Sequence, residues 1–272
     1  MARLKTTNTP NLEVLLLPPN AITLAVEQAL RRGHQGSHAA APVADQIAVR
    51  IASAITLNLI QAGQRLLEKD IGKVLNVSRA PVREALRILE RERLIEFRAR
   101  HGAVVTAPDA SDLFDIYVVR DALYQIMLKQ LMDERTDELQ AVFRQHLPKV
   151  GKAADDVSVD DYTLESFLLN LAMIDLLSNR LIVDLLTSIS LRTLRYVRLG
   201  LAANPDLLRT SLKTWRALQR AVERRDIAAV LVTAQKRIEG SRDAAMRALA
   251  PPPSAATRRT PRTLDRKAPA QV

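Results

Sequence analysis

The sequence predicts a mainly α-helical protein, with an N-terminal winged helix-turn-helix and a C-terminal antiparallel all-α bundle. Two observations carry this prediction. Between Ile71 and Glu90, apolar and basic residues separate onto two faces at helical spacing across one short turn. From Ala110 to Ala250 the hydrophobic periodicity is helical throughout, without an alternating strand pattern.

Composition divides the chain into four segments. We expect an N-terminal extension over residues 1–42, a winged helix-turn-helix over 43–108, a helical domain over 109–250 and a disordered basic tail over 251–272. Residues 20–32 have a capping residue and an amphipathic pattern, so they form either one helix or a disordered stretch before a linker. The alternative for the tail is a basic arm that touches flanking DNA.

The helix-turn-helix prediction rests on two inward apolar stripes. A first helix is expected from Ile47 to Ile60, and the two stripes follow it: Ile71, Val74 and Leu75, then Val82, Ala85, Leu86 and Leu89, with Val77 in the turn and Ser78 as cap. Arg79, Arg83 and Arg87 follow at i, i+4 and i+8 on the other face. Guanidinium groups in such a row suit phosphate oxygens and the N7/O6 edge of guanine. The competing interpretation is a solvated charged face.

A hairpin after the second helix favours the DNA interpretation. Two short β-prone runs, 94–98 and 103–106, enclose the basic turn Ala99-Arg100-His101-Gly102. Such a wing places Arg100 and His101 against the sugar-phosphate backbone or the minor groove.

Residues 43–107 resemble the winged helix-turn-helix of the GntR family of bacterial transcription regulators. The stretch VSRAPVREALRILERERLIE is similar to the family signature VSRTPVREALRRLEAEGLV, and 62–66 and 67–70 resemble its PGxxL turn and LSERE-type helix start. The resemblance implies DNA contacts by Lys69, Ser78, Arg79, Arg83, His101 and Gly102. Arg93 stands where the family often has glycine, and a side chain disfavours positive φ there.

Charge agrees with a polyanionic partner. The chain carries a net charge of +10, of which +4 falls on residues 43–108, whereas residues 109–250 are neutral. Lys and Arg neutralise phosphates and supply most sequence-independent affinity for nucleic acid. Aromatic residues are 3% of the chain and none interleaves with the arginine row, so duplex DNA is favoured over single strands.

Several other classes are not expected. The sequence has no apolar run long enough to span a bilayer, no leader pattern and no cysteine, so we expect a cytoplasmic protein without a membrane partner. It has no Gly-rich phosphate loop, nucleophile elbow or His-Glu metal motif, so we do not expect an enzyme.

Six helices are predicted in the second half of the chain. They run from Ser111 to about Met132, Thr136 to Val150, Asp160 or Asp161 to Leu177, Asn179 to Ala202, from Asn204-Pro205-Asp206 onward with proline in the first turn, and from a capping Asp226 to Pro251. A neutral helical bundle of this size can enclose a ligand cavity.

This half resembles the effector and dimerisation domain of the FadR branch of the family. The similarity lies in residues 117–123, 177–179 and 215–226. It implies a homodimer that places two winged helices on a palindromic operator and senses a small-molecule effector.

Many members of that branch hold a divalent metal with an Asp, a His four residues later, and two further His. Registered on the similar segments, these positions fall on Ser166 and Asn170 and near Trp215 and Arg237. We therefore predict no metal and no other cofactor. Arg237 stands near the position of the cation, so we predict that the effector is a small organic anion gripped by this arginine, with Ser166, Asn170 and Trp215 around it as further effector-binding residues.

Arg120 and the pair Arg192 and Arg195 are secondary candidates for effector binding, with a solvated face as the competing interpretation; for Arg237 the alternatives are an ion pair or simple exposure. The predicted function is thus a sequence-specific repressor whose operator binding responds to this anion. The alternative is a ligand-independent or architectural DNA-binding protein with a degenerate effector site.

Overall fold

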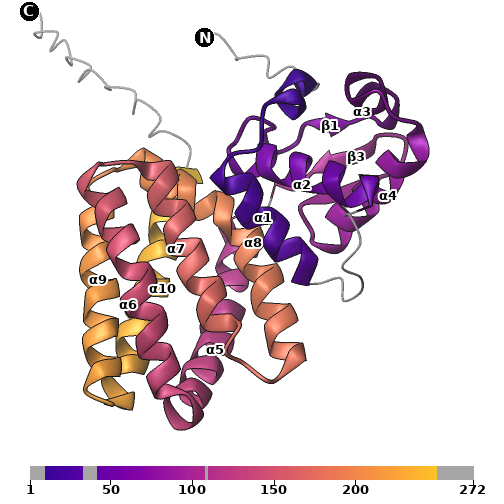
Figure 1. Cartoon of the computed structure of the whole chain (residues 1–272). Coiled ribbons are helices and arrows are strands. Elements are labelled where there is room, and N and C mark those ends of the chain that lie inside the picture. The colour runs from indigo at the N-terminus through magenta and orange to yellow at the C-terminus, as the bar shows by residue number, and fades with distance from the viewer. Residues whose placement is uncertain (1–9, 33–41, 108–109, 250–272) are drawn as a thin grey trace, which may run out of the picture.

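The computed structural model describes residues 10–32, 42–107 and 110–249. Figure 1 shows a bundle of long helices beside a smaller unit of short helices and strands, which confirms the predicted fold class. The bundle consists of α5 (Ala110–Glu134), α6 (Thr136–Asp155), α7 (Val159–Ile174), α8 (Arg180–Ala203), α9 (Leu207–Glu223) and α10 (Ile227–Leu249). Of the predicted linker 33–42, residues 33–41 lie outside the described residues, as does the predicted tail 251–272.

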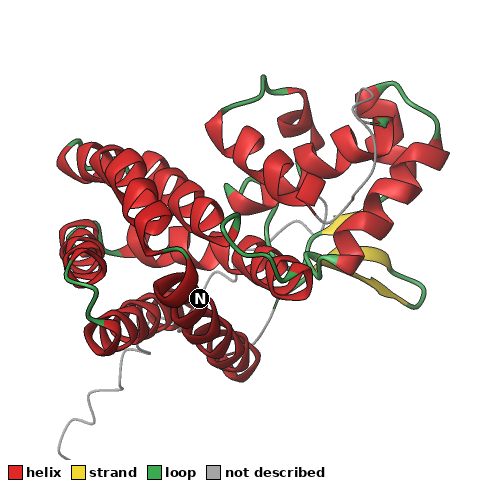
Figure 2. Ribbon diagram, turned by 60° about the horizontal axis from the view of Figure 1, so that its bottom comes forward, coloured by secondary structure: helices red, strands yellow, loops and turns green. Residues whose placement is uncertain are grey.

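The smaller unit is a winged helix. Its elements are α2 (Val43–Thr56), β1 (Arg65–Leu66), α3 (Glu68–Leu75), α4 (Arg79–Arg91), β2 (Ile95–Arg98) and β3 (Gly102–Val105). The strands form an antiparallel sheet in the order β1-β3-β2, with Ile95 opposite Val105 and Arg98 opposite Gly102. Figure 2 shows the β2–β3 hairpin extending beyond the helices. The two-residue strand β1 was not predicted because it is too short to show alternation.

The turn between α3 and α4 depends on a close backbone approach. A Cβ built on Gly72 would lie 2.9 Å from the carbonyl oxygen of Val77, so glycine allows the chain to fold back here. Asn76 ends α3 in the left-handed region with φ of 52°, which asparagine tolerates better than most residues. The inward residues Val82 and Leu86 are then fully buried, as the apolar stripe predicts.

Three local expectations need correction. Helix α2 begins at Val43 and ends at Thr56 rather than spanning 47–60. Ser78 occupies the N-cap position of α4, but its side chain makes no capping hydrogen bond. Helix α9 begins at Leu207, so Pro205 precedes the N-cap Asp206 instead of lying in the first turn.

The bundle is organised around Trp215, which is completely buried and meets Phe143 edge-on at a centroid distance of 6.2 Å. The predicted cap of α10 is confirmed, because the Asp226 carboxylate accepts a hydrogen bond from the Ala229 amide at 3.0 Å. Helix α6 continues beyond the predicted end at Val150 to Asp155, with Pro148 inside it on the exposed face.

An N-terminal segment joins the two units. A 3₁₀ turn, η1 (Leu12–Leu16), contacts α2 and α3, and helix α1 (Ala21–Arg32) packs on α2, α7 and α8. The Asn20 side chain accepts from the Thr23 amide at 2.9 Å and caps α1. Of the two alternatives for residues 20–32, the structure shows the helix. None of the described helices combines the length and the apolar character needed to cross a membrane.

Candidate DNA-binding surface and ligand cavity

Helix α4 presents its basic row to solvent. Val82, Leu86 and Leu89 on the inner face are fully buried, whereas Arg79, Arg83 and Arg87 are exposed. The helix therefore separates its residues as the sequence predicts: one face fills the core and the other offers three guanidinium groups to a polyanion.

Two of these arginines meet acidic side chains. Arg83 donates from Nε to Glu68 Oε1 and from Nη2 to Glu68 Oε2, both at 2.9 Å. Arg87 lies 3.7 Å from Glu84, one turn back on its own helix. The hydrogen bond from Arg83 holds the pKa of the Glu68 carboxyl below its usual value, and the charges of Arg79 and Arg87 act in the same direction. The contact of Glu68 with Arg83 was not predicted, because it joins two helices that are separate in the sequence.

The remaining predicted DNA-binding residues flank α4. Lys69 is exposed in the first turn of α3, and Ser78 is exposed directly before α4. At the tip of the wing, Arg100 and Gly102 take the left-handed conformation with φ of 62° and 73°. His101 is exposed, its Nδ1 donates to the Ala99 carbonyl oxygen at 2.9 Å, and its own carbonyl oxygen accepts from Arg65 Nε at 2.9 Å. The wing tip is thus a braced turn with basic side chains outside.

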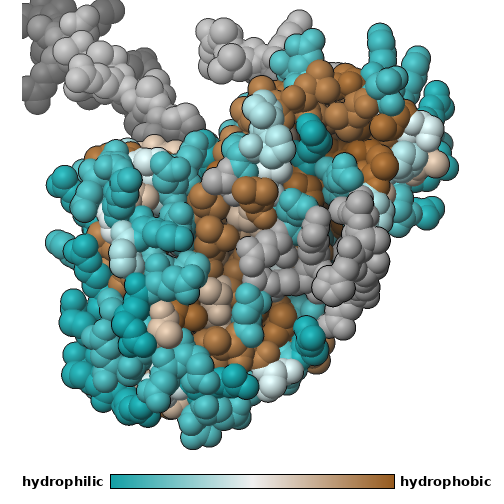
Figure 3. Space-filling model, viewed as in Figure 1, coloured by the Kyte–Doolittle hydropathy of each residue, from teal (hydrophilic) through white to brown (hydrophobic). Residues whose placement is uncertain are grey.

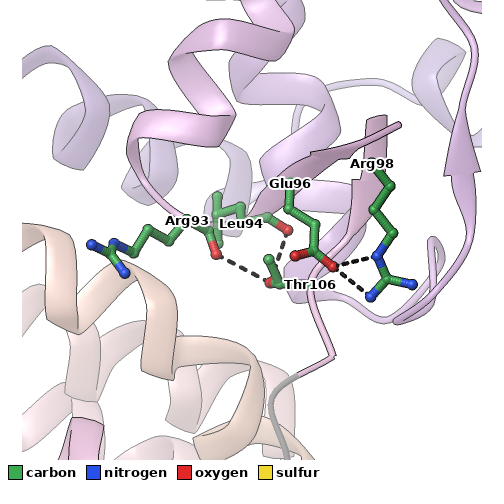
Figure 4. A network of polar contacts seen from close by, with 5 residues as sticks. All are labelled: Arg93, Leu94, Glu96, Arg98 and Thr106. Atoms are coloured by element: carbon green, nitrogen blue, oxygen red, sulfur yellow. Dashed lines mark hydrogen bonds and ion pairs between the residues drawn. The ribbon is translucent and has the colours of Figure 1, made fainter. Parts of the chain in front are cut away.

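Arg93 does adopt the positive φ that its side chain disfavours, with φ of 54°. Thr106 stabilises this turn, because its hydroxyl bridges the carbonyl oxygens of Arg93 and Leu94, each at 3.1 Å (Figure 4). Figure 4 also shows the neighbouring ion pair of Glu96 with Arg98 on β2. Arg93 therefore takes the positive φ that a glycine would adopt easily at this position, although it carries a side chain.

A cavity of about 170 Å³ lies inside the bundle. Hydroxyl, amide and cationic side chains from α5, α7, α8, α9 and α10 line it together with apolar groups. The polar lining residues are Arg120, Tyr162, Thr163, Ser166, Asn170, Ser190, Thr193, Thr210, Ser211, Thr214, Lys236, Arg237 and Ser241. No aspartate or glutamate is among the lining residues, so the cavity has positive charge without an internal counter-ion.

Arg120 is one of the two arginines in the cavity wall. It is 5% exposed, and its Nη1 donates to Thr193 Oγ1 at 2.9 Å. The guanidinium carbon lies 5.7 Å and 5.5 Å from the ring centroids of Tyr117 and Tyr124. Its Nε is buried and has no hydrogen-bond partner. A buried donor without a partner is costly, which makes this edge of Arg120 available to a ligand acceptor.

Arg237 is the second arginine, and it lies over the indole of Trp215, with the guanidinium carbon 3.4 Å from the ring centroid. Burial lowers the pKa of Arg237 to about 10, and the charge of Arg120 acts in the same direction. The group therefore stays charged at neutral pH. Trp215 itself does not line the cavity; it is a fully buried support for Arg237 rather than a separate ligand contact.

Of the four positions registered on the metal ligands of the FadR branch, Ser166, Asn170 and Arg237 meet in this one cavity, and Trp215 lies behind Arg237. Ser166 and Asn170 line it from α7, Arg237 lines it from α10, and the Asn170 side-chain oxygen accepts a hydrogen bond from Tyr124. Among the described residues, no group of three or more His, Cys, Asp or Glu side chains is placed to hold a metal ion. Hydroxyl, amide and guanidinium groups suit an anionic or polar organic ligand.

The structure places Arg192 and Arg195 elsewhere. They line a groove between the bundle and the winged helix, and Arg195 Nη2 donates to Asn58 Oδ1, just after α2, at 3.1 Å. Burial lowers the pKa of both arginines. Neither arginine lines the cavity that holds Arg237, although both were candidates for the effector site. Arg195 is two residues from the lining residue Thr193, so the helix turns these two side chains to nearly opposite sides.

Fold and site together define a two-domain protein, with a winged helix-turn-helix and a helical domain that encloses a cavity. The family model described as bacterial regulatory proteins of the gntR family matches residues 43–105, and the FCD domain model matches residues 115–239. The chain thus has the architecture of the FadR-type GntR regulators, as the sequence resemblance predicts.

Individual relatives agree with this assignment. The chain is 33% identical over 98 residues to an uncharacterized HTH-type transcriptional regulator, YdhC, of Bacillus subtilis, an alignment that covers 36% of this chain and 44% of that protein. It is 34% identical over 94 residues to the gluconate operon transcriptional repressor of Bacillus licheniformis, covering 35% and 38% of the two chains. The chain thus spans less than half the length of these curated relatives. Both relatives are named as regulators of transcription.

Among solved structures, McbR/YncC of E. coli is similar in fold, with a TM-score of 0.64 and 18% sequence identity. The match covers 84% of this chain and 99% of that one. At this identity the likeness supports the arrangement of the two domains and says nothing of the ligand.

Proposed function

We propose that this protein is a transcription regulator, acting as a repressor in the bacterial cytoplasm, which binds duplex DNA as a homodimer and releases it when a small organic anion enters the bundle. The single observation that carries the DNA half is the exposed row Arg79, Arg83 and Arg87 on α4. Lys69 stands at the start of α3 and the braced wing lies at the end of the sheet. Helices in this arrangement enter the major groove, and wings contact the backbone or the minor groove. Repression rather than activation is supported by one relative, which is named as the gluconate operon transcriptional repressor.

The ligand half rests on the charge of the cavity. Arg120 and Arg237 face a space without any lining carboxylate. Removed from bulk water, a guanidinium gains more from an anionic partner than it does at the surface, and it can hold a carboxylate through two parallel hydrogen bonds. The hydroxyls of Thr163 and Ser190 have no hydrogen-bond partner and are buried, so they are free to bind further polar atoms of the ligand.

Dimerisation is proposed to occur through the bundle. On α5, Val118 and Ile126 are 50% and 48% exposed, and on the start of α8 Leu181 is 67% exposed. Figure 3 shows hydrophobic residues gathered over this end of α8. An apolar face of this kind suits a two-fold partner of the same chain, whereas the basic winged helix opposes pairing by self-repulsion.

Helix α8 links the two functions. Its Ser190 and Thr193 line the cavity, and Thr193 accepts the hydrogen bond from Arg120, whereas Arg195 bonds to Asn58 of the winged-helix unit. A ligand that draws Arg120 away from Thr193 acts on the same helix that holds the DNA module. Such a ligand changes DNA affinity only if it binds the two arrangements with different affinity.

The test starts with the full-length protein and a random duplex library, from which bound sequences are selected. Thermal shift is then measured with a panel of small carboxylates and with their neutral amides, followed by fluorescence anisotropy on a selected duplex. We expect one or more carboxylates, and not their amides, to raise the melting temperature and to release the duplex.

Two results would contradict the proposal. Failure to enrich any sequence would remove the DNA-reading role. Enrichment without a response to any carboxylate would favour the ligand-independent DNA-binding protein instead.

A further inference from the structure

Glu68 occupies one edge of an arginine that belongs to the recognition row. Arg83 uses Nε and Nη2 to grip both carboxylate oxygens of Glu68 at 2.9 Å. These two parallel donors are also the arrangement with which arginine holds guanine O6 and N7. In the free protein, therefore, the Glu68 carboxylate occupies the edge of the Arg83 guanidinium that would bind a base.

The position of Glu68 makes it more than a surface ion pair. It stands in the first turn of α3, and its carboxylate feels the charges of Arg79 and Arg87 as well as of Arg83. A negative charge among three arginines weakens the attraction of this surface for phosphate of any sequence. The pair is also easy to open, since the side chain of Arg83 is 56% exposed and that of Glu68 is 25% exposed. Exposed pairs of this kind shift an equilibrium by about fivefold at most.

We propose that Glu68 is a specificity-determining residue, which withholds Arg83 from random DNA and yields it to guanine. The inference rests on the proposed function, in which α4 reads duplex DNA. A correct guanine offers two acceptors in one plane and replaces both hydrogen bonds of the carboxylate, a contact worth about 5- to 150-fold in affinity. The released carboxylate can then accept from the N4 amino group of cytosine, which phosphate cannot provide.

The test compares Glu68→Gln with Asp70→Asn in the full-length protein. Both changes remove one negative charge from the same turn of α3, but in the described structure only Glu68 contacts Arg83. Affinity is measured for a duplex selected by the wild-type protein and for a random duplex, each at several salt concentrations.

We expect Glu68→Gln to bind the random duplex several-fold more tightly, with a salt slope steeper by about one because the freed Arg83 takes up a phosphate. Discrimination between selected and random duplex should fall by up to about fivefold. Asp70→Asn should change both affinities by the same factor and leave discrimination intact. In the double variant Glu68→Gln with Arg83→Gln, the gain on random duplex should vanish.

Equal behaviour of Glu68→Gln and Asp70→Asn would overturn the inference, because net charge alone would then explain the effect. Loss of binding to the selected duplex in Glu68→Gln, with an unchanged circular dichroism spectrum, would overturn it as well and make Glu68 an indispensable DNA contact. Failure of the proposed function looks different: the wild-type protein would then select no duplex at all, and Arg83→Ala would have no effect on discrimination.

Discussion

Arginines serve the two domains under opposite conditions. On α4, Arg83 and Arg87 stand in water and lie near the carboxylates of Glu68 and Glu84. In the bundle, Arg120 and Arg237 are held by hydroxyls and aromatic rings, with no carboxylate in the cavity wall. The difference teaches that environment, rather than residue type, decides the partner. Exposed guanidinium groups suit a long polyanion, which is bound through many weak contacts. Buried guanidinium groups suit a single small anion, because charges attract more strongly away from water.

The two domains are also expected to differ in dimerisation, which we assign to the bundle. The largest expected effect is on the stability of the dimer. Replacing Val118 and Ile126 on α5 by arginine should make the protein monomeric, because two apolar side chains on each subunit become charges in the proposed interface. We expect a loss of at least about 3 kcal/mol in dimer stability. Sedimentation velocity measures it, with Arg247→Glu on the exposed end of α10 as control. A dimer that survives the double change would move the interface elsewhere.

The buried arginines come next. Arg237→Ala should weaken effector binding by about 2–5 kcal/mol, since it removes one partner of a desolvated charge pair, while operator affinity without effector stays the same. Arg237→Lys keeps the charge but not the two-pronged grip, so it should recover only part of the loss. Anisotropy titrations of the effector against the protein–duplex complex provide the measurement, with Arg247→Ala as the matched change on α10. A normal response in Arg237→Ala, or stoichiometric divalent metal in the wild-type protein, would show that the cavity works by another means.

The exposed arginines should give a smaller and more sequence-dependent effect. Arg79→Ala is expected to cost about 1–3 kcal/mol on the selected duplex and to relax the preference at one base position. Selection from a random library with the variant displays that relaxation directly. Arg91→Ala, in the last turn of the same helix, serves as control. If affinity for selected and random duplexes fell equally, Arg79 would be reassigned to phosphate.

Lys69 should act on phosphate alone. Lys69→Ala is expected to reduce the dependence of log affinity on log salt by about one for every duplex, without changing base preference. Lys73→Ala, an exposed lysine one turn later on α3, provides the comparison. An unchanged salt slope in Lys69→Ala would take it off the surface that meets DNA.

The smallest effect concerns a carboxyl group inside the bundle. Burial raises the pKa of Glu165, and the charge of Asp161 adds to this, whereas Lys149 opposes it. A folded-state pKa above the unfolded value means that the folded protein binds more protons, so stability falls as pH rises from the ordinary pKa of a glutamate through the raised pKa of the folded state. Glu165→Gln should flatten this dependence and raise stability slightly at neutral pH. Urea unfolding from mildly acidic to neutral pH tests it, against Glu223→Gln on the exposed end of α9.

The winged helix was largely predictable because its information is local. The apolar stripe of α4, the turn at Val77 and the basic hairpin each lie within a few residues, and a similar family signature covers them. Contacts between distant residues were not predictable in the same way. The grip of Glu68 on Arg83 joins two helices, and β1 pairs through only Arg65 and Leu66.

The residues that line the cavity were partly predictable. What the sequence does not reveal is which face of a helix turns toward the cavity. Registering the chain on similar segments placed Ser166, Asn170 and Arg237, and these side chains do line one cavity. Arg192 and Arg195 were chosen for their charge alone, and charge does not reveal which side of α8 turns inward. Ser78 shows the same limit at a finer scale, since a residue type suited to capping made no capping bond.

The packing of helix α1 has a consequence for folding during synthesis on the ribosome. It packs on α2 close by in the chain, but also on α7 and α8, which begin only at Val159 and Arg180. A ribosome adds about 5–20 residues per second, so α1 emerges on the order of ten seconds before those partners exist. During that time the side chains of Ile22, Val26 and Leu30, which are buried in the folded protein, are only partly covered. Helix α1, although it is synthesised before α2, is then among the last of the described helices to dock, and its docking requires that both halves of the chain have folded.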